Sequence, residues 1–387
     1  MDRADLTLSA GPNDVSSGVR AATGGPVLYH YDPVFGDRFR ETERMIGQIY
    51  GSSGHEIILM QGEAVLGLEA AARSLVRRGT SCLNLATGVF GKGFGYWLTA
   101  IGADLHEIET PYDEIVTGEA VAAYLEAHPE ITVVSVVHSE TPSGTLNPVW
   151  DIGPIARSHG AVTIVDVVSS FGGIELRPED WQLDLLVAGP QKCLGGPPGM
   201  SLVAVSEQAW AAIEANPDAP RGSFLSLLDW REQWHARDHF PYTPSVSDLN
   251  GVWAAARELL DEGLEASIDR HRRVADACWD GVEAMGLRPW PVSRDIAAAC
   301  VTAIRVPDAL TDTQVRDHVR ATYGVQLSGG QGAGNLIRIG HLGATARPIF
   351  AVAGLAALGR GLADLGARVD VGAGLEAALA SLSASAT

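Results

Sequence analysis

A lysine and an aspartate are the residues of this 387-residue chain whose types and surroundings best suit joint chemistry. Lys192 follows a mostly apolar run, Leu183–Val187, and precedes a loop rich in Gly and Pro at 193–199. Asp166 is the one charged residue in the apolar run 161–168. If both runs form buried strands, both side chains lie at strand ends with little water around them. A desolvated lysine amine is a good nucleophile toward a carbonyl group.

Together, the two residues suit pyridoxal chemistry. Lys192 would form an imine with the aldehyde, and Asp166 would keep the pyridine nitrogen protonated so that the ring can accept electrons. Each residue also has a plainer interpretation. A lysine after a strand is commonly a solvated loop residue, and an aspartate in a strand often caps a local turn.

The composition predicts a soluble, cytoplasmic protein. Hydrophobic residues make up 46% of the chain, which is enough for a large core. The formal net charge of −19 argues against nucleic acid or an anionic membrane as a partner. The four cysteines form no C-x-x-C pair, so we expect a reducing compartment, no disulfide framework and no metal. We find no signal-peptide pattern and no apolar stretch of about 20 residues that could span a bilayer.

Short apolar runs alternate with amphipathic segments between residues 56 and 206, which predicts an α/β fold with a mostly parallel, seven-stranded sheet. The predicted strands are Glu56–Gln61, Ser81–Ala86, Asp104–Glu109, Thr132–His138, Val162–Val168, Leu183–Val187 and Ser201–Val205. The predicted helices between them include Glu63–Val76, Gly118–His128 and Val149–His159. In such sheets the functional site lies beyond the carboxyl ends of the strands, where both Asp166 and Lys192 fall.

The remainder of the chain predicts a smaller C-terminal α+β domain. A long helical stretch, Asn250–Met285, is expected to contain more than one helix. It is followed by a strand at Ala297–Val306, a helix at Thr311–Tyr323, a strand at Asn335–Ile339 and a final pair of helices. We expect three parts. They are an N-terminal segment packed on the small domain (1–20), a large pyridoxal-binding domain (21–265) and the small domain (266–387).

Several motifs resemble, in this order, those of the class V, fold-type I pyridoxal-phosphate aminotransferases, which include the alanine–glyoxylate and serine–glyoxylate enzymes. These motifs are Leu8–Pro12, Gly67–Ala71, Ser143–Pro148, Val165–Ser170, Gln191–Gly199 and Arg338–Gly343. Within the family, further segments resemble the pyridoxamine–pyruvate transaminases. These segments are Leu28–Pro33, Gly62–Gly67, Gly88–Trp97, Thr141–Gly144 and Thr243–Ser247.

The resemblance implies roles for residues around the pyridine ring. Lys192 would carry the aldimine and then move the proton between the substrate carbon and C4′. Asp166 would pair with the ring nitrogen. Phe90 would stack on the ring and Val168 would pack on its opposite face. Thr141 matches a hydroxyl that contacts the ring oxygen, although a simple turn role in its Thr-Pro-Ser-Gly bend is also open.

The remaining site residues are also inferred from the resemblance. Ala64 and Gln191 complete the predicted cofactor-binding set. Arg338 would hold the substrate carboxylate, because a guanidinium group suits that bidentate task. Gly11 and Tyr29 lie in segments that match the substrate side of the site.

Glu63 occupies the place where ordinary family members bind the cofactor phosphate at a helix N-terminus. A carboxylate there would repel a phosphate dianion and could accept a hydrogen bond from a neutral hydroxymethyl group. The pyridoxamine–pyruvate enzymes have a glutamate at this place, and their pyridoxal is unphosphorylated. The alternative is that Glu63 only stabilises its helix, as acidic first-turn residues do.

The segment Ser328–Gly332 departs from the pyridoxamine–pyruvate pattern. Gln331 falls where those enzymes carry a second arginine, and the segment is two residues shorter before Arg338. The loss of a cation implies either weaker carboxylate binding or a different amino acceptor.

The leading hypothesis is a transaminase that moves the amino group of unphosphorylated pyridoxamine to a 2-oxo acid such as pyruvate, giving pyridoxal and an amino acid. Pyridoxal or pyridoxamine would then bind at Lys192 as a substrate. A conventional alanine- or serine–glyoxylate aminotransferase with bound pyridoxal 5′-phosphate is the alternative. A carbon–sulfur lyase fits less well, because neither Cys193 nor Cys300 lies in a suitable mobile loop. A catalytically silent vitamin-binding protein is the fourth hypothesis.

The resemblance also implies that the site lies at a subunit interface. Tyr242–Ser245 resembles the segment that a neighbouring chain lends to the site. We therefore expect a homodimer, and a homotetramer remains open.

Overall fold

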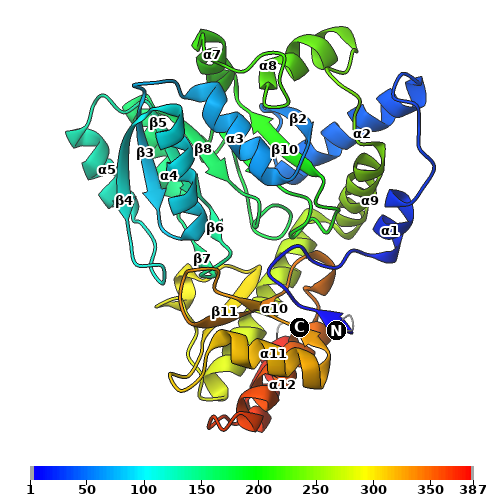
Figure 1. Cartoon of the computed structure of the whole chain (residues 1–387), viewed down its shortest axis with the longest axis vertical. Helices are drawn as coiled ribbons and strands as arrows, with labels where there is room; N and C mark the ends of the chain where they lie inside the picture. The colour runs from blue at the N-terminus through cyan, green and yellow to red at the C-terminus, as the bar shows by residue number, and fades with distance from the viewer. Residues whose placement is uncertain (1–3, 385–387) are drawn as a thin grey trace.

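The computed structural model describes residues 4–384 and has a seven-stranded sheet at its centre (Figure 1). The strand order is β2-β10-β9-β8-β5-β3-β4. The strands are β2 (Glu56–Gln61), β3 (Ser81–Ala86), β4 (Asp104–Glu109), β5 (Val133–Val137), β8 (Val162–Asp166), β9 (Leu185–Ala188) and β10 (Met200–Val205). Only β10 runs antiparallel to its neighbours, so the predicted α/β fold with a mostly parallel sheet is confirmed.

The carboxyl ends of β2, β3, β5, β8 and β9 all lie on the same side of the sheet. Within the parallel part, Asp166 at the end of β8 pairs in register with Val137 of β5 and Val187 of β9. β10 is antiparallel to both β9 and β2, so β2 runs in the same direction as the parallel strands. Every residue of β5, β8 and β9 is buried, as expected of strands covered on both faces.

The predicted helices around this sheet form with small differences at their ends. They are α3 (Ala64–Leu75), α5 (Gly118–Ala127) and α6 (Val149–His159). The other elements of this part are α1 (Ser17–Thr23), α2 (Pro33–Tyr50), α4 (Val89–Ile101), α7 (Glu207–Ala215), α8 (Leu227–Asp229) and a π-helix, η1 (Trp230–His235). Between residues 4 and 384, no helix is both long enough and apolar enough to cross a membrane.

The predicted helical stretch from 250 to 285 is two helices, α9 (Val246–Glu262) and α10 (Leu264–Ala284). Gly263 separates them with a φ of 96°, which a residue with a side chain rarely adopts. Below the large sheet in Figure 1 lies a second, three-stranded antiparallel sheet with order β11-β14-β13. This part consists of β11 (Val301–Arg305), β13 (Ser328–Gly329), β14 (Leu336–Gly340), α11 (Asp312–Tyr323), α12 (Pro348–Asp364) and α13 (Val371–Ala384).

The N-terminal segment contacts both parts of the molecule. β1 (Leu6–Thr7) pairs in parallel with β12 (Val325–Gln326), whereas Ser16 donates a hydrogen bond to Glu258 of α9. One large cluster of buried apolar side chains surrounds the seven-stranded sheet, and a second lies between α10, α12 and the smaller sheet. The predicted domain boundaries at 20 and 265 stay a prediction, and residues 1–3 and 385–387 lie outside the described residues.

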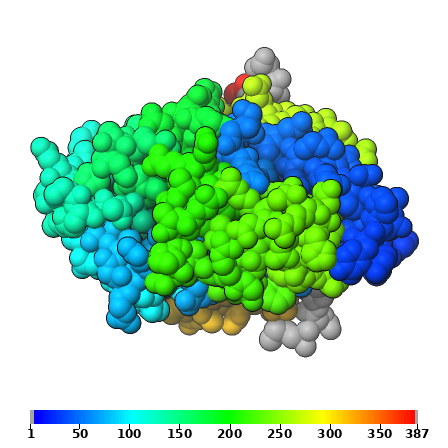
Figure 2. Space-filling view, turned by 90° about the horizontal axis from the view of Figure 1, so that it is seen from above, coloured from blue at the N-terminus to red at the C-terminus, as the bar shows by residue number. Residues whose placement is uncertain are grey.

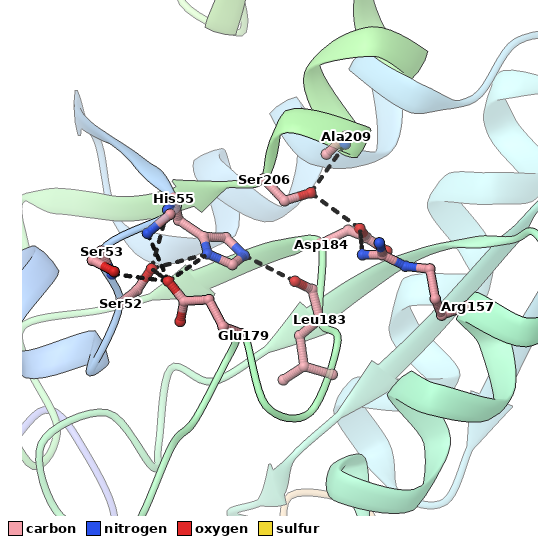
Figure 3. A network of polar contacts seen from close by, with 10 residues as sticks. Ser52, Ser53, His55, Arg157, Glu179, Leu183, Asp184, Ser206 and Ala209 are labelled. Atoms are coloured by element: carbon pink, nitrogen blue, oxygen red, sulfur yellow. Dashed lines mark hydrogen bonds and ion pairs between the residues drawn. The ribbon is translucent and has the colours of Figure 1, made fainter.

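A polar network around Asp184 lies at the amino ends of the strands, on the side of the sheet opposite Lys192. Figure 3 shows this network. Asp184, fully buried before β9, accepts hydrogen bonds from Arg157 at 2.6 Å, from the backbone of Thr163 at 3.0 Å and from Ser206 at 3.0 Å. A neighbouring group joins the loop before β2 to the loop before β9, because His55 contacts the carbonyl oxygen of Leu183 at 2.8 Å. These contacts fix the starts of the strands, on the side of the sheet away from Lys192.

Candidate active site

The carboxyl edge of the sheet opens into a cavity of about 270 Å³. All the predicted site residues except Thr141 and Tyr29 line it. The lining residues among them are Gly11, Glu63, Ala64, Phe90, Asp166, Val168, Gln191, Lys192, Gln331 and Arg338. They come from the N-terminal segment, from the strand ends, loops and helix starts that follow strands of the large sheet, and from the smaller sheet with its β13–β14 loop, so the cavity lies where these three parts meet.

Lys192 is a buried amine in the loop that follows β9. Its side chain reaches the N-terminal segment, where Nζ donates a hydrogen bond to the carbonyl oxygen of Ala10 at 2.6 Å. Burial lowers the pKa of Lys192, the Arg338 guanidinium adds to this effect, and the Asp166 carboxylate opposes it. The net shift favours the neutral amine that nucleophilic attack and proton transfer require.

Gly11 allows the close approach of the N-terminal segment to Lys192. Its φ is 111°, and a Cβ atom at this position would lie 2.5 to 2.6 Å from Cδ, Cε and Nζ of Lys192. Any side chain at residue 11 would therefore displace the amine.

Asp166 ends β8 at the floor of the cavity. Its Oδ1 accepts a hydrogen bond from the Val168 backbone at 2.9 Å, and Oδ2 has no hydrogen bond to a described residue. Burial raises the pKa of Asp166 to about 6, against the hydrogen bond from Val168 and the charge of Lys192. A cationic ring nitrogen at Oδ2 would reverse this shift, because an adjacent opposite charge favours the carboxylate.

Glu140 is a buried carboxylate that sequence reasoning missed. It lies on β6 (Ser139–Glu140), which forms a short hairpin with β7 (Thr145–Leu146). Its carboxylate accepts hydrogen bonds from the backbones of Phe90 at 3.2 Å and Gly91 at 2.6 Å, so it holds the first turn of α4. Burial raises the pKa of Glu140 to about 7. The available signal in the sequence was that Glu140 is the one charged residue in the segment 139–144, directly after a predicted strand.

Glu63 caps α3 with its own side chain. Oε2 accepts a hydrogen bond from the Val65 backbone at 2.9 Å, and Oε1 accepts one from Nε2 of Gln191 at 2.6 Å. The hydroxyl of Ser201 donates to the carbonyl oxygen of Glu63 at 2.9 Å. The helix N-terminus where an anion would bind is therefore already occupied by a carboxylate that its neighbours hold in place.

Arg338 lies on β14 and is almost fully buried. Its Nε donates to the carbonyl oxygen of Gly329 at 2.8 Å and Nη1 donates to that of Thr141 at 2.9 Å. Nη2 has no partner among the described residues and remains available to a carboxylate. Burial lowers the pKa of Arg338 to about 10, so the group stays charged at neutral pH. Gln331 also lines the cavity and has a positive φ of 50°.

Thr141 and Tyr29 do not line this cavity. Thr141 is buried, and its hydroxyl hydrogen-bonds that of Ser169, which does line the cavity. Tyr29 is 66% exposed, and its ring lies 5.5 Å from that of Tyr31. Their roles stay predictions. Ala10, Ser139 and Ser169 line the cavity and were not predicted, although each neighbours a predicted residue or motif.

The donor set fits a pyridine ring that carries an aldehyde or an amine. The site offers a buried amine, a buried carboxylate and a buried guanidinium group, together with the half-exposed ring of Phe90. Oε1 of Gln191 is a buried acceptor without a partner among the described residues, which suits a hydroxyl donor on the ligand.

Comparison with known proteins gave matches over nearly the whole chain. The family model described as aminotransferase class-V matches residues 21–353. The pyridoxamine–pyruvate transaminase of Mesorhizobium japonicum is 49% identical over 98% of this chain and 97% of its own. The crystal structure of pyridoxamine–pyruvate aminotransferase from Mesorhizobium loti superposes with a TM-score of 0.96, at 48% identity over 99% of this chain and 98% of the other. The ureidoglycine–glyoxylate aminotransferase of Bacillus subtilis follows with a TM-score of 0.92, at 28% identity over 97% of each chain.

Proposed function

Because this chain belongs to the class-V aminotransferase family, we propose that it transfers the amino group of unphosphorylated pyridoxamine to a 2-oxo acid such as pyruvate. The products are pyridoxal and an amino acid. The similarity to enzymes named for pyridoxamine and pyruvate supports both substrates. The family also uses pyridoxal 5′-phosphate, so the phosphorylated vitamer is the alternative ligand.

The observation that carries the proposal is the carboxylate of Glu63 at the N-terminus of α3. Gln191 and the Val65 backbone hold that carboxylate in place, so it cannot turn away without losing two hydrogen bonds. A phosphate dianion at this helix end would meet a fixed negative charge, and like charges in contact cost several kcal/mol. A neutral hydroxymethyl group can instead donate a hydrogen bond there.

When bound, the pyridoxal ring supplies a conjugated system that accepts electrons from the substrate carbon. Lys192, with its neutral amine, would take the proton from C4′ of pyridoxamine and deliver it to the keto carbon of the 2-oxo acid, which becomes the α-carbon of the amino acid. Asp166 holds the proton on the ring nitrogen. Phe90 and Val168 hold the ring between them.

Arg338 binds the carboxylate of the 2-oxo acid through Nη2 and the second hydrogen of Nη1. Gln331 lines the same cavity and contributes a neutral amide in place of a second cation. The guanidinium group of Arg338 is therefore the one cation that binds the substrate carboxylate, and small 2-oxo acids with a single carboxylate fit it best.

We also propose that the protein is a homodimer. Tyr29, Tyr31 and Phe224 are exposed aromatic side chains, and the ring of Phe224 lies 4.3 Å from that of Tyr242. Figure 2 shows the blue N-terminal segment and the green segment that contains residues 220–240 side by side on one face. Contact with a second copy would cover these rings and bring Tyr242–Ser245 to the neighbouring site.

The test is a half-reaction assay with purified protein. Pyridoxamine is mixed with pyruvate, glyoxylate or 2-oxoglutarate, and the aldehyde product is followed by its absorbance. We expect turnover with pyridoxamine and pyruvate, and loss of turnover in Lys192→Ala with pyridoxal still bound. Mass spectrometry that finds a stoichiometric phosphorylated vitamer in the purified protein would overturn the proposal. A protein that binds pyridoxal without turning over any 2-oxo acid would do the same.

A further inference from the structure

Two histidines and a glutamate cluster at the outer edge of the large sheet, away from the cavity. His106 lies on the edge strand β4, and His128 and Glu130 lie in the turn that follows α5. One donor atom from each residue lies within 4.8 Å of the other two. We propose that these three side chains bind a divalent transition-metal ion of the zinc type.

The two donor distances that involve Glu130 are close to those of a single-ion site. Nδ1 of His128 lies 3.1 Å from Oε1 of Glu130, and Nε2 of His106 lies 3.7 Å from the same oxygen. Zinc binds imidazole nitrogen and carboxylate oxygen at about 2.0–2.2 Å, so neighbouring donors of a tetrahedral site lie about 3.3 Å apart. The side chain of Glu130 is 47% exposed and can make the small adjustment that closure requires.

His106 presents an unused nitrogen to this cluster. Its Nε2 is buried and has no hydrogen-bond partner among the described residues. The whole side chain is 15% exposed. Its other nitrogen, Nδ1, lies 3.2 Å from the hydroxyl of Tyr124. With the Nδ1 proton donated to that hydroxyl, the lone pair of Nε2 is free for a metal. Metal-binding histidines are typically oriented in this way by a partner on the second nitrogen.

Aromatic packing fixes the two imidazole rings. The ring of His128 stacks on Tyr124 with centroids 4.5 Å apart and planes 26° apart. The ring of His106 meets His128 edge-on at 4.7 Å. Asp104 lies two residues before His106 on the same face of β4, and its carboxylate oxygen is 3.9 Å from Nε2 of His106. A fourth ligand can therefore come from Asp104 or from water.

The donor set selects the class of ion. Two imidazoles with one carboxylate suit zinc, nickel, cobalt or copper, whereas magnesium and calcium prefer oxygen ligands. The composition alone predicted no metal, because that prediction considered only the cysteines. An ion here would tie β4, which has a neighbour on one side only, to the end of α5, and so stabilise the folded chain by mass action. It would take no part in the chemistry at Lys192.

The test is isothermal titration of the tag-free, full-length protein with zinc chloride after treatment with EDTA and dialysis. We expect one saturable zinc site per chain, magnesium binding at least tenfold weaker, and unchanged transaminase activity with or without zinc. His106→Ala should weaken zinc binding by about tenfold or more. Glu130→Gln, at an exposed side chain, should do the same without a risk to folding.

His318→Ala is the matched control, because His318 also contacts a carboxylate, Asp364 at 3.1 Å, and lies outside the cluster. It should bind zinc as the unmodified protein does. Equal zinc affinity in the unmodified protein, His106→Ala and Glu130→Gln would overturn the proposal. Magnesium binding as tight as zinc binding would also overturn it.

Discussion

At the scale of single residues, the site depends on ionisable groups that burial shifts toward their neutral forms. Burial lowers the pKa of Lys192 and raises that of Asp166 to about 6. Both shifts have the same cause, since a charge is costly where water is excluded. A protonated pyridine ring would restore the charge on Asp166 and leave Lys192 neutral, so the two side chains together suit that kind of ligand.

Gly11→Ala tests the close approach of the N-terminal segment to Lys192. The new Cβ would lie 2.5 to 2.6 Å from the lysine side chain and would displace its amine. We expect kcat to fall about 100-fold, as misplacement of a catalytic group by about 1 Å typically does. Gly93→Ala on α4 is the control, since its Cβ would meet no atom within 4 Å. Steady-state kinetics on both variants measure the effect, and wild-type kcat in Gly11→Ala would contradict it.

Most of the lining residues could be predicted from sequence, because they lie directly after predicted strands or within motifs. Thr141 and Tyr29 show the limit. Thr141 lies in a predicted segment, but its hydroxyl is directed to Ser169, which lies within the motif Val165–Ser170 and was given no role of its own. Glu140 was missed because its role depends on α4, and the contact joins residues 50 positions apart.

At the scale of elements, apolar strands were predictable and helix junctions were less so. The strands of the large sheet agree with the predictions to within a few residues at each end, since a strand buried on both faces is a plain apolar run. The stretch 250–285 was expected to hold more than one helix, and two form, but the helical pattern continues across Gly263, so periodicity alone could not locate the junction between α9 and α10. The pairing of β1 with β12 joins residues more than 300 positions apart, and strands of two residues carry no pattern.

Asp184→Asn tests the network that fixes the strand starts. The substitution removes the charge that pairs with Arg157 at 2.6 Å and weakens the bonds to Thr163 and Ser206. We expect the free energy of unfolding in urea to fall by about 2–4 kcal/mol, somewhat less than for a fully buried ion pair, because the Arg157 side chain is 35% exposed. Activity per folded molecule should stay unchanged, because the network lies at the opposite edge from Lys192.

The control for this substitution is Asp180→Asn, at an exposed carboxylate in the same loop. It should change the free energy of unfolding by less than about 0.5 kcal/mol. Equal stability of the two variants would show that the buried network does not stabilise the fold.

At the scale of the whole molecule, the exposed aromatic surface of Tyr29, Tyr31 and Phe224 predicts self-association. Sedimentation velocity at micromolar concentration should give the mass of a dimer of 40.8-kDa chains. Phe224→Asp should shift the protein toward the monomer and lower its activity, because the site would lose the neighbouring segment. A fully active monomer would contradict this prediction.

Selection of the unphosphorylated vitamer by Glu63 is measured by the ratio of kcat/KM for pyridoxamine to that for pyridoxamine 5′-phosphate. We predict a ratio of about 100 or more in the unmodified protein, given the cost of placing like charges in contact. Glu63→Gln keeps the size of the side chain and removes its charge, so the ratio should fall at least tenfold. Glu69→Gln, which neutralises another carboxylate on α3, should leave it unchanged. A ratio below one in the unmodified protein, or one that Glu63→Gln does not change, would show that Glu63 does not select the vitamer.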